Sequence, residues 1–241
     1  MASTTETGHA KNIANLKALN EIIAGFGADY APSNPLIQLA AMQTLYTTCY
    51  GLQGDVNTQN GIYQPIENAR IASFKDVKPT VRGVRSAAKS SGAGKSFVAD
   101  VNASVNKVLG VRISKATPTE GDPAGTSASQ QSYDNTVNNF DALVKVCGAQ
   151  PMYNPSKVSL KVPALTAKQA AMNLANNAVK TAVVPYNTAL GKRNKAMYKS
   201  ETGLVDVAAA AKNEVRSIYG FSSAEFKRVS KLQFKKLVKI V

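Results

Sequence analysis

Two stretches of sequence decide the fold: "YAPSNPLIQLAAM" at residues 30–42 and "YNPSKVSLKVPAL" at residues 153–165. Each begins with Tyr, one further residue, Pro and Ser, and each continues into an apolar run. Because proline fixes its own φ and biases the residue before it toward extended geometry, each stretch predicts a non-helical connector followed by a helix. The recurrence of this connector 123 positions later indicates two copies of one unit.

An ungapped comparison of the chain with itself at that shift supports the duplication. It finds eleven identities over 59 positions, where average composition predicts roughly four. Beyond Arg70 the register slips by eight, and "GVRSAAKSSG" at 83–92 then matches "EVRSIYGFSS" at 214–223. The identical pairs are Asn12/Asn135, Asn15/Asn138, Gly25/Gly148, Tyr30/Tyr153, Pro32/Pro155, Ser33/Ser156, Ala41/Ala164, Val56/Val179, Thr58/Thr181, Tyr63/Tyr186 and Arg70/Arg193.

Both copies are predicted to be helical, since apolar residues recur at helical spacing and glycines follow as stop signals. Pro185 is expected to kink or interrupt the long helix of the second copy. The final stretch is expected to form a basic amphipathic helix that begins with a capping box from Ser222 to Glu225. The expected helices cover about residues 13–26, 36–53, 62–74, 76–89, 94–110, 137–147, 164–183, 202–220 and 222–241.

The predicted fold class is therefore all-α, with two tandem pseudo-symmetric helical-bundle repeats. Residues 114–132, "SKATPTEGDPAGTSASQQS", are rich in Pro, Gly, Ser and Thr without periodicity, which is typical of a linker. The predicted domains are a flexible N-terminus at 1–10, a first helical repeat at 11–113, the linker at 114–132 and a second helical repeat with its basic C-terminal helix at 133–241.

The second copy resembles a family of uncharacterised bacterial helical proteins. The resemblance rests on the Tyr-Asn-Pro connector, on "TGLVDVAAAAKNEVRSIYGFSSAEFKRVSKLQF" at 202–234 and on the family's C-terminal pattern YGxxSxE(F/Y)KxVxxxxF. It covers residues 153–234 well and residues 30–110 only in part, where Pro79 and Gly83 depart from the pattern. The resemblance implies a helical fold and no particular activity.

Residue types that carry catalysis or bind metals are sparse. Cys49 and Cys147 lie in apolar helical contexts and are expected to be buried free thiols. With His9 as the single histidine, the sequence offers no Cys/His zinc site and no base for Ser-His or Cys-His chemistry. The glycine-rich stretch at 90–97 has Lys89 where a phosphate-binding loop needs its first glycine, so it is interpreted as a turn between helices. We expect no enzymatic activity, no cofactor and no metal.

The start of the chain has no basic region followed by an apolar one, and no run of 18 apolar residues occurs. Neither a signal peptide nor a transmembrane segment is therefore expected, and a cytoplasmic location is the default prediction.

The net charge of +14 bears most directly on function. Residues 1–120 carry 12 Lys/Arg against 8 Asp/Glu, or +4, and residues 121–241 carry 17 against 7, or +10. Such an excess favours an anionic partner, which is nucleic acid, an acidic protein or an anionic membrane surface. The candidate anion- or nucleic-acid-binding residues are Lys75, Lys78, Arg82, Arg85 and Lys89, then Lys192, Arg193, Lys195 and Lys199, and finally Lys227, Arg228, Lys231, Lys235 and Lys236.

Three interpretations of these basic groups stay open. The first group steps by three and four residues, which draws one stripe on a helix and suits phosphate contacts. The last group would make an amphipathic helix that suits an anionic membrane. All three groups are also consistent with solvated helix faces that keep an alanine-rich bundle soluble. No motif for base readout occurs, so nucleic acid would be bound through its backbone.

The repeated tyrosines and arginines suggest a second candidate site. Tyr63 and Arg70, with their counterparts Tyr186 and Arg193, lie seven apart on one helix face and are predicted to line a shared groove. The alternative is a Tyr–Arg stacking pair at a seam between helices.

The connector tyrosines, Tyr30 and Tyr153, are predicted to pack with their hydroxyls bonded to the backbone, with a ligand-facing pair as the alternative.

The predicted function is a non-enzymatic basic helical bundle that acts as a binding, scaffold or assembly module and associates with itself or with an anionic partner. The alternative is a sequence-independent nucleic-acid-binding protein that uses the basic stripes.

Overall fold

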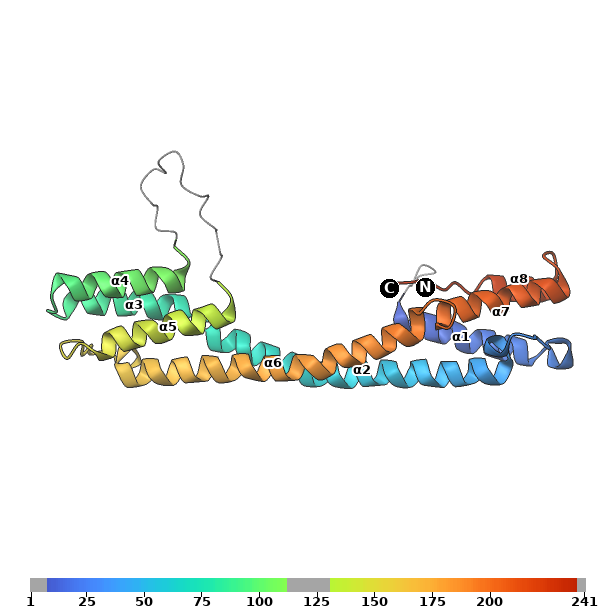
Figure 1. Ribbon diagram of the computed structural model, residues 1–241, viewed down its shortest axis with the longest axis horizontal. Coiled ribbons are helices and arrows are strands. Elements are labelled where there is room, and N and C mark those ends of the chain that lie inside the picture. Colours follow the sequence, from blue (N-terminus) through green and yellow to red (C-terminus); the bar gives the residue numbers. More distant parts are fainter. Residues whose placement is uncertain (1–7, 112–130, 238–241) are drawn as a thin grey trace, which may run out of the picture. The chain divides into compact units, whose positions relative to one another are not determined.

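The computed structural model describes residues 8–111 and 131–237, and every regular element in these ranges is helical. This confirms the predicted all-α class, while most of the predicted linker lies outside the described residues. In chain order the elements (Figure 1) are α1 (His9–Ala24), η1 (Gly27–Asp29), η2 (Pro35–Ile37), α2 (Leu39–Phe74), α3 (Val77–Ser90), α4 (Lys95–Leu109), α5 (Tyr133–Gly148), η3 (Val158–Leu160), α6 (Val162–Tyr198), α7 (Leu204–Tyr219) and α8 (Ala224–Ser230).

The two connectors adopt the conformation that their tyrosines and prolines predict. The Tyr30 hydroxyl donates to the Ile37 carbonyl at 3.0 Å, and the Tyr153 hydroxyl donates to the Leu160 carbonyl at 2.9 Å. Both tyrosines are buried, so each hydroxyl satisfies a carbonyl at the end of a short 3₁₀ turn. The prediction of backbone-bonded hydroxyls is confirmed for both connectors, which places these tyrosines in a structural role.

The helix ends follow several signals of the sequence. Gly25 caps α1, and Gly110, with φ of 69°, ends α4 in the left-handed conformation that glycine adopts most easily. The helices predicted at 36–53 and 62–74 form one continuous helix, α2. Pro185 lies inside α6 without interrupting it. Pro185 is exposed, so water can bond the carbonyl that the proline leaves without a partner.

The described chain forms two compact units. Unit 1 contains residues 1–62 and 183–241, and unit 2 contains residues 63–182. This division differs from the predicted repeats at 11–113 and 133–241, because unit 1 combines the start of the first range with the end of the second, and unit 2 contains the remaining part of each. The units carry similar charge: 14 Lys/Arg against 8 Asp/Glu in unit 1, or +6, and 15 against 7 in unit 2, or +8.

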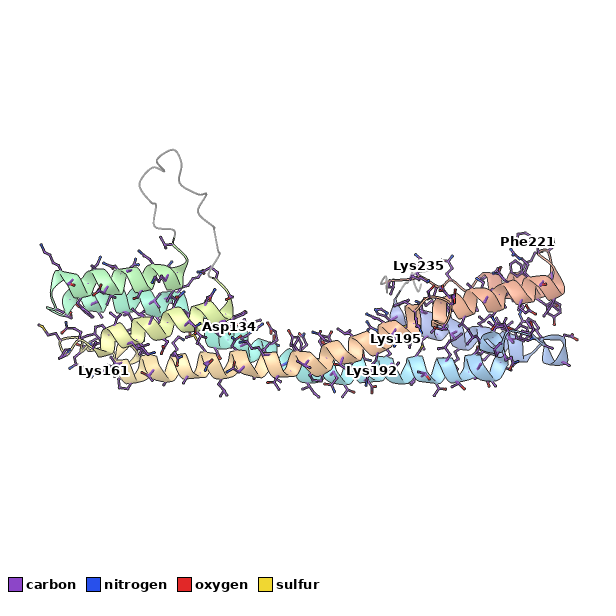
Figure 2. The ribbon with its side chains drawn as sticks, in the orientation of Figure 1. Asp134, Lys161, Lys192, Lys195, Phe221 and Lys235 are labelled. Atoms are coloured by element: carbon purple, nitrogen blue, oxygen red, sulfur yellow. The ribbon has the colours of Figure 1, made fainter. Side chains whose placement is uncertain are left out.

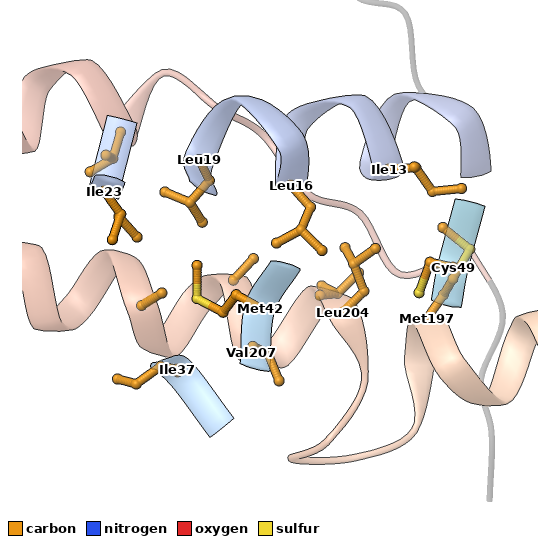
Figure 3. Close-up of a cluster of buried hydrophobic side chains, with 14 of the residues drawn as sticks. Ile13, Leu16, Leu19, Ile23, Ile37, Met42, Cys49, Met197, Leu204 and Val207 are labelled. Atoms are coloured by element: carbon orange, nitrogen blue, oxygen red, sulfur yellow. The ribbon is translucent and has the colours of Figure 1, made fainter. Parts of the chain in front are cut away.

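The core of unit 1 lies between α1, the first part of α2 and α7. Figure 3 shows Leu16 and Leu19 of α1 pointing toward Met42 of α2 and Leu204 of α7. All four side chains are fully buried. Burial of this kind stabilises by about 1.5–3 kcal/mol per large aliphatic side chain, so the apolar stripe that the sequence predicts on α1 is the inner face of unit 1.

Unit 2 builds its core from α3, α4, α5 and the first part of α6. Val81 and Val84 of α3, Val101 of α4 and Phe140 of α5 are fully buried. The glycine at position 83 lets η3 approach α3, because a Cβ atom there would stand only 3.1 Å from Leu160 Cδ2. Gly83 is thus a packing position within a continuous helix.

The C-terminal end departs from the predicted helix. The helix α8 ends at Ser230, and its N-cap is Ser223, which accepts from the Phe226 amide, in place of the expected Ser222. Residues 231–237, which we name the C-terminal strap, form no helix and run back along α1. The predicted basic helix at 222–241 is therefore wrong beyond Ser230 within the described residues.

Side chains of α1 and α7 hold the strap by its backbone. Asn12 Nδ2 donates to the Lys235 carbonyl at 2.8 Å, and the Lys235 amide donates to Asn12 Oδ1 at 3.1 Å. Asn15 Nδ2 donates to the Gln233 carbonyl at 2.7 Å, and Lys212 Nζ donates to the Leu232 carbonyl at 2.9 Å. These bonds take the place of helical bonds, which explains why the segment stays extended.

Candidate anion-binding surface

The α3 stripe consists of Lys75, Lys78, Arg82, Arg85 and Lys89, and four of its five members are exposed. Lys75 precedes the helix, so Lys78, Arg82, Arg85 and Lys89 place four charges over about 16 Å of α3 at 1.5 Å per residue. Arg85 is half-buried and donates to Asn106 Oδ1 of α4 at 2.5 Å. None of the ion pairs in the described part of the chain involves a stripe residue.

The opposite side of α3 is packed away. Val77, Val81, Val84 and Ala88 are buried in unit 2. The exposed side of α3 therefore carries the basic side chains, and its apolar side is buried in the core of unit 2.

The second basic group does not share one surface. Lys192, Lys195 and Lys199 are exposed on α6 and just beyond its end, and Lys192 and Lys195 are labelled in Figure 2. Arg193 is only 6% exposed. Its guanidinium donates to Asn194 Oδ1 from Nε at 3.1 Å and from Nη2 at 2.8 Å. Arg193 therefore belongs to the interior of unit 1, and its prediction as a surface anion contact is wrong.

The third basic group is divided between α8 and the strap. Lys227 and Arg228 of α8 and Lys231 are exposed. Lys235, labelled in Figure 2, is exposed on the strap. Lys236 pairs with Asp206 Oδ2 at 2.8 Å.

Asp206 holds Lys236 in a short ion pair on the surface. The hydrogen bond from Lys236 lowers the pKa of Asp206, and the Glu201 amide also donates to the carboxylate. Asp206 thus neutralises one of the predicted anion contacts.

The four residues of the predicted groove divide between the units: Tyr63 and Arg70 lie in unit 2, and Tyr186 and Arg193 lie in unit 1. In unit 2, Arg70 Nη2 donates to both carboxylate oxygens of Glu67 at 2.7 Å, and the Tyr63 hydroxyl donates to the same carboxylate at 3.3 Å. The guanidinium lies 4.0 Å from the ring centroid of Tyr133 of α5. Arginine therefore does stack on a tyrosine at a helix seam, and this tyrosine is Tyr133 of α5.

A polar network in unit 2 extends this contact. Asn176 Oδ1 accepts from Arg70 Nη1 at 3.4 Å, and Asn176 Nδ2 donates to Asp134 Oδ1 at 2.7 Å. Lys180 Nζ donates to the same oxygen at 2.5 Å. The sequence analysis did not predict these partners. Only the Glu67–Arg70 pair could have been predicted, because residues three apart on a helix lie side by side.

Unit 1 surrounds its arginine differently. His9 Nδ1 and the Tyr198 hydroxyl are hydrogen-bonded at 2.6 Å. Burial, together with the positive charge of Arg193, lowers the pKa of His9. Burial also lowers the pKa of Arg193, and none of the ion pairs among the described residues includes it. Arg193 is therefore a buried cation whose hydrogen-bond partner, Asn194, is neutral.

The two cysteines are buried in the cores of the two units. Cys49 and Cys147 are buried free cysteines, and burial raises the pKa of each thiol to about 11. Both are protonated near neutral pH and therefore poor nucleophiles. Within residues 8–111 and 131–237, no group of three or more His, Cys, Asp or Glu side chains is placed to hold a metal ion.

The fold and these surfaces describe an all-α protein with exposed basic helix faces. Comparison with protein-family models, curated proteins and solved structures finds no match to this chain. Among the helices of the described ranges, none is long and apolar enough to cross a membrane.

Proposed function

We propose that the protein is a non-enzymatic binding module that serves as a scaffold or assembly factor by contacting an anionic partner. The observation that carries the proposal is the α3 stripe, where exposed charges lie in a row without acidic partners in the described ion pairs. Exposed charges of one sign that are left unpaired favour association with the opposite sign. The proposed setting is the cytoplasm.

The packing of the basic helices argues against a lipid surface as that partner. An amphipathic helix binds a bilayer by burying its apolar face in it, but the apolar face of α3 is already buried in unit 2. The helix α8 has seven residues, and its Val229 is fully buried in the core of unit 1. The favoured partner is therefore a water-soluble polyanion.

A sequence-independent nucleic-acid binder is the second candidate, favoured by the linear spacing of the stripe. Four charges over about 16 Å of α3 correspond to the axial length of about five phosphates of one strand, at 3.4 Å each. Backbone recognition of this kind needs no base-reading motif.

Fluorescence polarisation separates the two candidates. The full chain is titrated into labelled random-sequence DNA, random-sequence RNA and poly-glutamate at 50 and 200 mM salt. Four phosphate contacts on duplex DNA would weaken binding about 150-fold between these salt concentrations. Binding to poly-glutamate alone supports the scaffold proposal, and no salt-sensitive binding to any of the three probes refutes both candidates.

A matched pair of variants locates the surface. The fourfold variant K75Q/K78Q/R82Q/K89Q should lose this binding. The control K11Q/K95Q/K107Q/R216Q removes the same charge from exposed positions and should retain most of it. Equal losses in both variants would show that only net charge matters. Self-association, the assembly part of the proposal, is tested by light scattering over a concentration series, where a constant monomer mass contradicts it.

We also infer that the chain contains two copies of one unit, and that each compact unit combines the first half of one copy with the second half of the other. The burial of equivalent residues in the two copies supports this inference. Helices α1 and α5 both have 16 residues and begin 124 positions apart. Four buried apolar positions of α1 match buried positions of α5 at this shift. After the connectors, buried positions match at a shift of 123. The pairs are Ile13/Val137, Leu16/Phe140, Leu19/Leu143 and Ile23/Cys147, followed by Met42/Leu165, Cys49/Met172 and Val56/Val179.

A further inference from the structure

A groove of about 410 Å³ lies in unit 1, between α1 and the first part of α2. Ala10, Ile13 and Ala14 of α1 form one wall. Tyr46 and Tyr50 of α2 contribute their rings, whose centroids are 5.9 Å apart. The volume falls within the range of small-molecule sites, and flat aromatic surfaces of this kind are typical of them.

The polar groups of the groove are Lys17, Gln53 and Asn57, and the tyrosine hydroxyls join them. No acidic residue lines it. Gln53 Nε2 donates to Asn57 Oδ1 at 3.0 Å, whereas Gln53 Oε1 is buried without a hydrogen-bond partner. Rotation of both amides by 180° keeps a bond between them, now donated by Asn57 Nδ2 to Gln53 Oε1, and places a Gln53 N–H at the unpaired position. An unpaired buried amide group is costly and calls for a partner.

The corresponding place in unit 2 is filled by a carboxylate. At the shifts that align the buried positions, Ala10 corresponds to Asp134 and Gln53 corresponds to Asn176. In unit 2, Asn176 Nδ2 donates to Asp134 Oδ1 at 2.7 Å. Unit 1 has a methyl group where unit 2 has this carboxylate, and its glutamine is left with an unpaired atom.

In the described part of the chain, the buried arginine of unit 1 also lacks the acidic partner that its counterpart in unit 2 has. Glu67, which neutralises Arg70 in unit 2 at 2.7 Å, corresponds to Leu190. Arg193, the counterpart of Arg70, is buried without an ion pair among the described residues. At the groove itself, the positive group is Lys17, which is held only by an exposed contact of 3.8 Å with Glu21.

We propose that this groove binds a small organic acid with a flat apolar body. The carboxylate of the ligand takes the place that Asp134 occupies in unit 2 and accepts from the Gln53 amide. Lys17 adds charge attraction at the groove. The ring of the ligand lies against Tyr46 and Tyr50, because 65% of Tyr50 is exposed and open to contact.

The test uses the full chain and a matched pair of probes, indole-3-acetate and its neutral amide. The two share shape and ring and differ in charge. Saturation-transfer NMR detects binding, and isothermal titration calorimetry measures the Kd. The carboxylate is expected to bind at least tenfold more tightly than the amide. Absence of binding at millimolar probe, or equal Kd values for the two probes, overturns the proposal.

Two variants tie binding to the groove. Ala10→Asp installs the carboxylate of unit 2 at an exposed position, and it should abolish binding of indole-3-acetate while the far-UV circular dichroism stays unchanged. Gln53→Leu keeps the size of the side chain and should lose the preference for the acid over the amide. Asn213→Ala, an exposed change on α7, is the control. Unchanged Kd values in both groove variants would contradict the proposal, even if the acid binds elsewhere.

Discussion

Replacing Asn12 by alanine removes both hydrogen bonds between α1 and the Lys235 backbone of the strap. Because Asn12 is only 2% exposed, water has little access to the position and does not replace these two hydrogen bonds in the variant. Two bonds contribute about 1 kcal/mol each to stability. The higher helix propensity of alanine returns about 0.5 kcal/mol. The expected loss in the free energy of unfolding is therefore about 1.5 kcal/mol, or roughly 3–6 °C in Tm for a chain of this size.

The assay combines urea unfolding, followed by circular dichroism, with amide hydrogen exchange. Exchange adds a local readout, because the Lys235 amide donates to Asn12 in the native protein and should exchange faster in Asn12→Ala. Asn213→Ala is the matched control: it makes the same change at an exposed position of α7 in the same unit and should be neutral or slightly stabilising. The reasoning is refuted if the two variants unfold within about 0.5 kcal/mol of each other, which is the size of the propensity difference, and exchange at Lys235 is unchanged.

Three further predictions follow from burial and backbone packing. Burial, and after it the charge of Arg193, lowers the pKa of His9 in the folded protein. The unfolded chain therefore binds more protons, and the free energy of unfolding falls as the pH drops below about 6.5. Urea unfolding at pH 7, 6 and 5 should show a smaller fall in this free energy for His9→Gln than for the native protein. Gly203→Ala would place a Cβ atom 2.7 Å from backbone atoms at the end of α6, and it should destabilise the protein by about 1–3 kcal/mol. Gly191→Ala would place a Cβ atom with nothing within 4 Å, and it should stabilise the protein by up to about 1 kcal/mol. Thermal unfolding of both variants checks these values. Native Cys49 and Cys147 should resist the thiol reagent DTNB at pH 8, because burial raises the pKa of each to about 11; rapid labelling without denaturant would contradict this.

Features that depend on neighbouring residues could be predicted from the sequence. The Tyr-x-Pro-Ser connectors predicted the backbone-bonded hydroxyls of Tyr30 and Tyr153, because a short turn brings the tyrosine to a carbonyl seven residues on. Gly25 and Gly110 marked helix ends for the same local reason. The α3 stripe was predicted from spacing alone, since the helix period determines which charges share a face.

Contacts between distant residues could not be predicted in this way. Phe226, Val229 and Leu232 continue at helical spacing past Ser230, so the sequence favoured a longer helix, yet Asn12 and Asn15 bind the backbone of the strap from more than 200 residues away. The packing of residues 1–62 with residues 183–241 in unit 1 likewise depends on contacts between residues far apart in the chain.

The sequence by itself determined where helices form and how their apolar and basic faces are arranged, because backbone propensity and side-chain period are local. Only the tertiary structure decided which face is buried. Arg193 and Lys192 are adjacent in the chain, yet the first lies inside unit 1 and the second is exposed. Whether a side chain is buried depends on which segments pack against it, and this packing is driven by the burial of apolar surface across the whole chain.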